Sequence, residues 1–419
     1  MTSSDKIRPR HVAVVGAGMV GLSTAWFLQE RGCYVTVLER ERVAAGASEG
    51  NAGWLTPGLA VPLPSPGILA YGIRAVLSRT APVHVPLWPD PHLRRFLAGF
   101  ARHCTTRRWR DGLRGYVTIN RRALEAYDDL AASDPTLATR RAEPFTVCFR
   151  TNEQRRQMVH ELEQLHAAGQ QLSFDLLDET ELRNIQPVLA PAVTVGLRLN
   201  DQRFIDPARY VAALADAVKS RGGEILAPVH VEDVTEDGAA VTVTTSMGQR
   251  DRFDTVVLAT GASLTTLGRK FGIRVPVQAG RGYSFSVRPQ VEVPGPIYLP
   301  VQRIACTPLD DRLRIAGLME FAAPDQPPDR RRLELLVESA RPLLAGVDLD
   351  DREDEWVGSR PVTADGLPLI GPTASSRVFA AGGHGMWGIV LGPITGKLLA
   401  QTIAEGQPAP ELAPFDPQR

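Results

Sequence analysis

The chain has few cysteines and few lysines, and neither sign of charge is in excess. Its 419 residues include 47 basic and 47 acidic side chains, so no overall field favours a nucleic acid or an anionic membrane as partner. Lysine occurs at four positions only, and we interpret the preference for arginine as a coding bias. The function must therefore be sought in local sites.

The cysteines follow no pattern that would join them. Cys33, Cys104, Cys148 and Cys306 form no C-x-x-C pair, and no histidine stands at the spacing of a zinc site. We therefore expect buried thiols in a reducing compartment, and we predict no metal site.

Long apolar segments are missing as well. No run reaches the roughly eighteen apolar residues that a bilayer-spanning helix needs, so we expect no transmembrane segment. The apolar run after the basic N-terminal stretch is only as long as a strand, which argues against a signal peptide. We expect a cytoplasmic protein. Its length predicts two domains, or one large domain with a substantial insertion.

The most informative stretch is HVAVVGAGMVGLSTAWFLQERGCYVTVLER, residues 11–40. It predicts a buried strand, a G-x-G-x-x-G turn over 16–21, a helix over 22–30 and a second strand over 34–38. An acidic residue, Glu39, ends the second strand. This order of strand, glycine turn, helix, strand and acid is typical of a dinucleotide site.

Each residue of that motif has a physical role. Gly16 permits the tight turn, Gly18 lets backbone N–H groups approach a pyrophosphate, and Gly21 lets helix and strand pack closely. Glu39 would accept hydrogen bonds from an adenosine ribose, which argues against a 2′-phosphate. The motif alone does not separate FAD from NAD. The loop of small residues after Arg40, with Ser48 and Asn51, favours FAD because it can follow an extended cofactor.

The remaining sequence predicts an α/β fold combined with an α+β fold. Predicted helices are a short one over 68–77, helical structure over 93–133, a polar surface helix over 153–166, an amphipathic helix from 206 and a helix over 329–344. Predicted strands lie at 145–149 and near 193–205, in a meander that ends at 256–259, and in an antiparallel series between 275 and 321.

We therefore expect a Rossmann-like cofactor domain and a discontinuous second domain built on a mostly antiparallel sheet. The predicted boundaries place 1–90, 206–271 and 355–419 in the cofactor domain. They place 91–205 and 272–354 in the second domain. The chain would leave the cofactor domain twice and return twice.

Two further candidate site segments lie near the C-terminal end, one around Arg360 and one around His384. Arg360 stands among prolines, glycines and aliphatic residues, with Asp365 as the nearest acid in sequence, so we expect it to meet an anion. An arginine bonded to backbone carbonyls or to Asp365 is the structural alternative. The glycine-rich turn around His384 precedes an apolar helix, and its backbone donors would favour negative charge. Arg281 is interpreted as a surface charge. His84, Arg303 and Glu320 are pocket candidates that no sequence feature distinguishes from surface residues.

With these motifs placed, the chain resembles the FAD-dependent amine oxidoreductases, the superfamily of D-amino-acid oxidase, glycine oxidase and sarcosine oxidase. It is most similar to the bacterial D-amino-acid dehydrogenases. The resemblance covers nearly the whole chain, and its carriers are GAGMVG with Glu39, the loop at 48–53, VVLATGA at 256–262, GRGYSFSV at 280–287, GSRPVTADGLPLIG at 358–371 and GHGMWG at 383–388.

The resemblance implies non-covalent FAD and a substrate carboxylate on Arg360, with Tyr283 and His384 as further substrate contacts. Tyr283 as core packing is the alternative. The cofactor contacts that it implies are Gly16, Gly18, Met19, Val20, Gly21, Glu39, Arg40, Ser48, Asn51, Ala52, Gly53, Val231, Thr260, Gly261, Ala262, Gly383, His384, Gly385, Trp387 and Gly388.

The implied reaction is oxidative deamination of a small amino acid, a D-amino acid being favoured. Hydride would pass from the α-carbon to flavin N5, giving an imino acid and then a keto acid plus ammonia. The alternatives are oxidation of a secondary amine such as sarcosine, glycine, proline or hydroxyproline, or of an amine in a biosynthetic pathway, a non-catalytic FAD-binding subunit, and a nicotinamide dehydrogenase. The implied electron acceptor is oxygen, a quinone or a redox carrier. Peripheral contact with the inner face of a membrane stays open.

Overall fold

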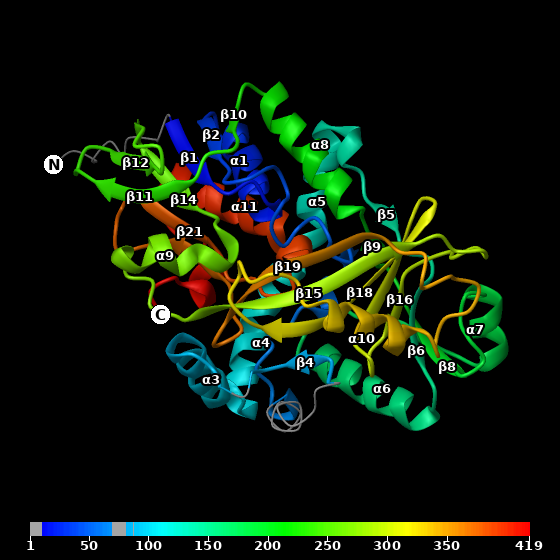
Figure 1. Ribbon diagram of the computed structural model, residues 1–419. Coiled ribbons are helices and arrows are strands. Elements are labelled where there is room, and N and C mark those ends of the chain that lie inside the picture. Colours follow the sequence, from blue (N-terminus) through cyan, green and yellow to red (C-terminus); the bar gives the residue numbers. More distant parts are fainter. Residues whose placement is uncertain (1–10, 69–80, 87) are drawn as a thin grey trace.

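The computed structural model describes residues 11–68, 81–86 and 88–419, and two groups of strands dominate it (Figure 1). The predicted helix over 68–77 lies, beyond residue 68, outside the described residues. The other predicted helices and strands are present within a few residues of their expected positions.

The first sheet is the predicted cofactor sheet. Its strands lie in the order β10 (Glu224–Leu226), β2 (Tyr34–Leu38), β1 (His11–Val15), β14 (Thr255–Leu258), β21 (Val378–Gly382) and β20 (Leu369–Pro372). All neighbours are parallel except β20, which runs antiparallel to β21. Alternate residues of β1 pack into separate cores on the two faces, as a sheet covered on both sides requires.

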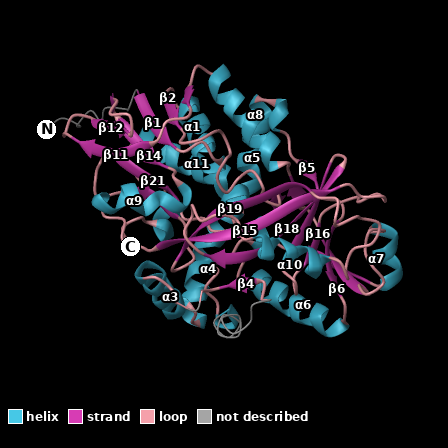
Figure 2. Cartoon of the chain, in the orientation of Figure 1, coloured by secondary structure: helices cyan, strands magenta, loops and turns pink. Residues whose placement is uncertain are grey.

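Helices cover one face of this sheet, and Figure 2 shows them gathered beside β1 and β2. They are α1 (Met19–Glu30), α5 (Ala123–Ser133), α8 (Pro207–Ser220) and α11 (Gly388–Glu405). A Cβ at Gly396 would lie 2.6 Å from the backbone of Ser23, so α1 and α11 touch closely enough to require glycine there. The other face carries the small sheet β11 (Val231–Glu236), β12 (Val241–Thr245) and β13 (Arg250–Phe253), with α9 (Leu264–Gly268).

The second sheet is longer and mostly antiparallel. Its order is β19 (Glu353–Thr363), β15 (Val277–Val287), β18 (Arg312–Phe321), β17 (Ile304–Leu309), β16 (Ile297–Leu299), β6 (Phe145–Phe149), β8 (Val195–Leu199) and β7 (Phe174–Leu177), with β4 (Val83–His84) beside β18. Only the pairs β16–β6 and β18–β4 are parallel among these described strands. The helix α10 (Arg330–Ala340) packs on one face, where Leu336 meets Leu313 and Ile315 in one core.

The remaining elements connect and cover the two sheets. They are α3 (Pro91–His103), α4 (Thr106–Asn120), α6 (Asn152–Ala167), α7 (Glu179–Ile185), a small sheet of β3 (Trp54–Leu55), β9 (Arg203–Phe204) and β5 (Arg140–Arg141), and the 3-10 turns η1 (Pro57–Leu59), η2 (Pro135–Leu137), η3 (Gly261–Ser263), η4 (Arg269–Phe271) and η5 (Pro410–Phe415).

The predicted fold class is confirmed, with a parallel-rich sheet and a largely antiparallel sheet in one chain. Two segments lie elsewhere than predicted. The strands β19 and β4 belong to the second sheet, although the residues 355–363 and 83–84 were assigned to the cofactor domain. Pairing of β19 with β15 over most of their length explains this, since that partner is distant in sequence. The other domain boundaries stay a proposal.

Candidate functional site

The glycine turn lies at the carboxyl end of β1. Gly16 has a φ of +114°, and a Cβ there would lie 2.5 Å from the carbonyl oxygen of Ala259. A Cβ at Gly21 would overlap the carbonyl of Gly16. Gly18 is the N-cap of α1, and the Met19 N–H donates to Ser48 Oγ over 3.1 Å. Glycine is therefore required at the first two of these positions by backbone geometry and close packing.

Glu39 closes the turn from the neighbouring strand. Its carboxylate accepts the Ala17 N–H at Oε2 over 2.8 Å and the Glu41 N–H at Oε1 over 2.9 Å. The Val229 N–H donates to the Glu39 carbonyl over 2.6 Å, which brings the start of β11 and Val231 alongside. The Arg40 guanidinium points elsewhere, to Glu41 at 2.9 Å on the surface. The acid and the glycine turn thus form one site, and Arg40 lies at its rim.

A loop of small residues continues from this site toward the second sheet. Ser48 stands at its start beside α1, and Asn51 Oδ1 accepts the Gly53 N–H over 2.9 Å. The carbonyl of Ala52 accepts a hydrogen bond from Thr307 Oγ1 over 2.7 Å. Gly53 has a φ of +78°, and a Cβ there would overlap the carbonyl of Ile205. We call residues 48–53 the cofactor loop.

The predicted residues after β14 and β21 lie at the same edge of the sheet. Thr260, Gly261 and Ala262 follow β14 directly, and the buried Thr260 Oγ1 has no hydrogen-bond partner in the described part of the chain. After β21, Gly383 and Gly385 have positive φ values of 72° and 56° on either side of His384.

The helix α11 then starts at Gly388. Trp387 is its N-cap and donates from Nε1 to the Val61 carbonyl over 2.9 Å. The N-cap residues of α1 and α11 supply no side-chain cap, and neither helix has an acidic residue in its first turn. Both helix ends therefore keep positive backbone dipoles directed at the edge of the sheet, where an anionic group is favoured.

His384 is buried between the two sheets. Its Nε2 lies 2.9 Å from Thr395 Oγ1, and Nδ1 is buried with no hydrogen-bond partner among the described residues. Burial lowers the pKa of this imidazole to about 3, so the ring is neutral at neutral pH. A β-bridge joins His384 to Val362, two residues after Arg360 on β19.

Arg360 extends from β19 over Gly282 of β15, where a Cβ would overlap the guanidinium. Its Nη1 donates to the carbonyl of Leu318 over 3.0 Å, and it forms no ion pair within the described residues. Asp365 is not its partner, because that carboxylate binds Arg419 at 2.8 Å and 3.0 Å. Burial lowers the pKa of the Arg360 guanidinium to about 10, which still leaves it charged at neutral pH. Most of its N–H donors remain available.

Tyr283 lies on the opposite face of β15. Successive strand residues point to opposite faces, so a side chain next to Gly282 points away from Arg360. Tyr283 packs into the core under α10, where its hydroxyl donates to Glu320 Oε2 over 2.6 Å. Its pKa is raised, mainly by burial and then by Glu320. The structure therefore brings Arg360, and not Tyr283, to the side of the cofactor loop.

The interpretation of Arg281 as a surface charge is wrong. Only 2% of its surface is exposed; Nη2 donates to the Pro327 carbonyl over 3.1 Å and Nη1 lies 3.5 Å from Glu320 Oε2. Glu320 is buried too. Arg281 lies two residues before Tyr283, on the same face of β15, and the sequence pattern does not show that α10 covers this face.

Trp356 was not predicted as part of the site. It lies on the same face of β19 as Arg360, and its indole fills the space over Gly358 and against Gly50 of the cofactor loop, where a Cβ on either glycine would overlap it. Because Gly358 pairs with Gly282, the indole and the guanidinium cover two adjacent glycines. The cation and the aromatic ring therefore stand side by side, facing the cofactor loop.

The model of one protein family matches residues 11–402, nearly the whole chain, and its description is FAD dependent oxidoreductase. The chain belongs to this family. FAD is therefore its cofactor, and the glycine turn, Glu39 and the two helix ends at the edge of the first sheet fit a dinucleotide that carries an anionic pyrophosphate.

Solved structures agree with the fold over the full length. Glycine oxidase from Geobacillus kaustophilus is 23% identical, with 98% of this chain and 99% of that chain covered and a TM-score of 0.73. L-proline dehydrogenase from P. horikoshii is 17% identical, with 98% of each chain covered and a TM-score of 0.71. L-alpha-glycerophosphate oxidase from Mycoplasma pneumoniae, solved with FAD bound, is 16% identical, with 96% of each chain covered and a TM-score of 0.71.

The described residues include neither a membrane-spanning helix nor a metal-binding cluster. None of the helices described is long and apolar enough to cross a membrane. No cluster of three or more His, Cys, Asp or Glu side chains suited to a metal ion occurs in the described ranges either.

Proposed function

We propose that the protein oxidises the α-carbon of a small amino acid, a D-amino acid being favoured by the resemblance of its motifs to bacterial D-amino-acid dehydrogenases. FAD, when bound, accepts the hydride that leaves the α-carbon. The imino acid formed is then hydrolysed by water to a keto acid and ammonia. The observation that carries the proposal is Arg360, a cation without an acidic partner in the described part of the chain, on the face directed at the cofactor loop.

The role of Arg360 would be to hold the substrate carboxylate. A guanidinium binds a carboxylate through two parallel hydrogen bonds, which sets both the position and the orientation of the α-carbon. The absence of side chains at Gly282 and Gly358 brings the Arg360 guanidinium and the Trp356 indole close to the strand backbone. Trp356 would then border the substrate and limit its size.

His384 would hold the turn before α11 in shape without exchanging protons. Its imidazole is neutral at neutral pH, since burial lowers its pKa to about 3, and Thr395 fixes one ring nitrogen. Hydride removal needs a neutral substrate amine more than a protein base, so the main contribution of the protein is positioning.

The second candidate is the oxidation of glycine or of a secondary amine that carries a carboxylate. Two of the similar structures, glycine oxidase and L-proline dehydrogenase, are named for such small or cyclic amino acids. Sarcosine, glycine, proline and hydroxyproline would present the same carboxylate to Arg360. The two candidates differ in the amine, for which no side chain of the site has been assigned.

The test is anaerobic reduction of the purified yellow protein. Loss of the visible flavin band is expected with at least one member of a panel of D- and L-amino acids and the secondary amines above. Each hit is compared with the matching amino alcohol, which lacks the carboxylate and should not reduce the flavin. Reduction by the amino alcohol at an equal rate would contradict the role of Arg360. If no amine reduces the flavin, a non-catalytic FAD-binding subunit is the better interpretation.

The electron acceptor and a membrane contact are tested separately. We propose oxygen, a quinone or a redox carrier as acceptor, and peroxide release in air distinguishes the first. A peripheral contact with an anionic membrane is supported by exposed arginines on α3 and α4 that form no ion pair among the described residues, namely Arg94, Arg95, Arg102, Arg107 and Arg110. Sedimentation with phosphatidylserine vesicles but not with phosphatidylcholine vesicles is expected, and equal recovery with both would contradict it.

A further inference from the structure

Side chains of three neighbouring strands hold the backbone of the cofactor loop. Arg314 of β18 donates from Nη1 to the Glu49 carbonyl over 3.0 Å. Ser284 of β15 donates from Oγ to the Gly50 carbonyl over 2.9 Å, and Thr307 of β17 donates to the Ala52 carbonyl over 2.7 Å. Three of the four carbonyls from residue 49 to residue 52 are thus bonded to the second sheet, although the loop belongs to the first.

These donors are buried. Ser284 and Thr307 are fully enclosed, and only 5% of the surface of Arg314 is exposed. A buried arginine normally has a carboxylate partner, because an unpaired charge is costly to bury. Arg314 has none within ion-pair distance in the described part of the chain, and its Nε is buried without a hydrogen-bond partner. Burial accordingly lowers the pKa of its guanidinium. The bonded partner of this cation is a neutral carbonyl of the loop.

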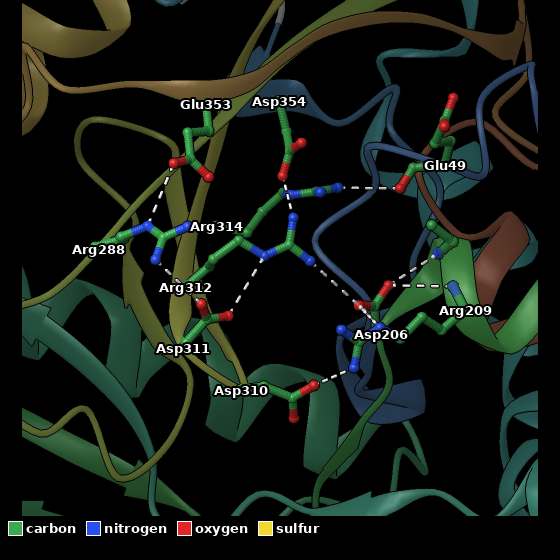
Figure 3. A network of polar contacts seen from close by, with 11 residues as sticks. Glu49, Asp206, Arg209, Arg288, Asp310, Asp311, Arg312, Arg314, Glu353 and Asp354 are labelled. Carbon is green, nitrogen blue, oxygen red and sulfur yellow. Dashed lines mark hydrogen bonds and ion pairs between the residues drawn. The ribbon is translucent and has the colours of Figure 1, made fainter.

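The acids near Arg314 are engaged by its neighbour, as Figure 3 shows. Arg312, two residues earlier on β18, forms an ion pair with Asp354 and lies 3.9 Å from both Asp206 and Asp311. Asp206 caps α8. The residue before it, Ile205, donates its N–H to the carbonyl of Gly53 at the end of the cofactor loop. The strand β18 therefore bonds the start of the loop directly, and it contacts Asp206, the residue after the one that bonds the end of the loop.

We propose that Arg314, together with Ser284 and Thr307, is a positioning residue that sets the backbone path of the cofactor loop and thereby the affinity for FAD. The sheet that carries Arg360 would then also fix the loop that follows the cofactor. This role would explain why an arginine stands here although its buried charge is costly. A serine or threonine hydroxyl on β18 would be too short to reach the Glu49 carbonyl. The proposal depends on the cofactor and not on the proposed substrate, so an inactive substrate panel would not affect it.

The test is a titration of FAD into the apoprotein of three variants, in which the quenching of flavin fluorescence reports binding. Arg314→Met removes the donor and should raise the Kd for FAD by about tenfold or more, since one charge-assisted hydrogen bond is lost. Arg314→Lys retains a donor and should recover part of that affinity. Arg288→Met is the matched control, because this arginine belongs to the same network but is 61% exposed and bonds only exposed acids. Its Kd should stay within about twofold of the wild type.

A second readout separates positioning from general stability. If Arg314 positions the loop, the rise in melting temperature on adding FAD should be smaller in Arg314→Met than in Arg288→Met, and the vibrational structure of the visible flavin band should change. An unaltered Kd and band shape with a lower melting temperature would overturn the proposal. Should Arg314→Met fail to fold, the double variant Ser284→Ala with Thr307→Val tests the same loop, and a wild-type Kd there would also overturn it.

Discussion

Replacement of Arg360 by methionine should separate activity from stability. Burial lowers the pKa of the guanidinium at this position from its usual value to about 10. At about 1.4 kcal/mol per pH unit, holding the charged form there costs the folded state about 3 kcal/mol, and the cost is fully present at every pH below 10. Methionine removes this cost and loses one hydrogen bond to the Leu318 carbonyl, worth about 1–2 kcal/mol. The variant should therefore be as stable as the wild type, or up to about 2 kcal/mol more stable.

The same replacement should lower kcat/KM although it does not lower stability. Two charge-assisted hydrogen bonds to a carboxylate, at about 1.5–3 kcal/mol each, are lost together. This corresponds to a fall of about 10² to 10⁴ in kcat/KM, with FAD still bound. Denaturant titration at pH 7.5 in excess FAD gives the stability, and steady-state rates on the amino acid that reduces the wild-type flavin give the activity. Arg288→Met, at an exposed arginine directly after β15, controls for the loss of an arginine.

The result that would refute this reasoning is a destabilisation of Arg360→Met by more than about 3 kcal/mol, as expected when a structural arginine is removed from a buried pair. Unchanged kinetics in a stable variant would equally refute the role in substrate binding.

Three other results are expected. Gly282→Ala should lower kcat/KM by about tenfold or more without loss of flavin, because the new Cβ overlaps the Arg360 guanidinium, whereas Gly67→Ala, which adds a Cβ in open space, should have no effect. His384→Gln should make the protein less sensitive to acid. The pKa of His384 is about 3 in the folded protein and near 6.5 in the unfolded chain, so the free energy of unfolding of the wild type falls by about 1.4 kcal/mol per pH unit below pH 6.5. Denaturant titrations of both proteins at pH 7 and pH 5 measure the difference. The buried Cys148, whose pKa burial raises to about 12, should resist thiol reagents in the native protein and react after denaturation; rapid native labelling would show that the strand opens.

Local patterns were sufficient to predict the cofactor half. The glycine turn, the strand over 34–38 and Glu39 depend on backbone conformation and on contacts within one short segment, so spacing alone locates them. The structure adds what those positions contact, such as the Ala259 carbonyl behind Gly16. The family match agrees with the predicted cofactor.

The substrate half depends on pairings that the sequence does not display. The segment around Arg360 contains prolines and glycines and has no strand pattern, yet it forms β19 because β15 pairs with it across more than seventy residues of chain. Strand alternation determines the face of β15 on which Tyr283 lies, but the sequence does not show that α10 covers this face. The hydroxyls of Ser284 and Thr307 alternate with apolar residues as on a solvated strand face, and only the approach of the cofactor loop makes them buried donors. Local reasoning therefore located Arg360 but not its surroundings.

The contact between α1 and α11 has a consequence for biosynthesis. The cofactor site needs the glycine turn at the start of the chain and the helix that begins at Gly388, and these two helices touch through Gly396. On the ribosome, the first strand and its helix emerge long before their partners β14, β21 and α11 are translated. The apolar strand β1 must remain exposed or bound to a chaperone until these partners have been translated. The complete FAD site can therefore form only after α11 has been synthesised, and a chain that stops before α11 should not retain the cofactor.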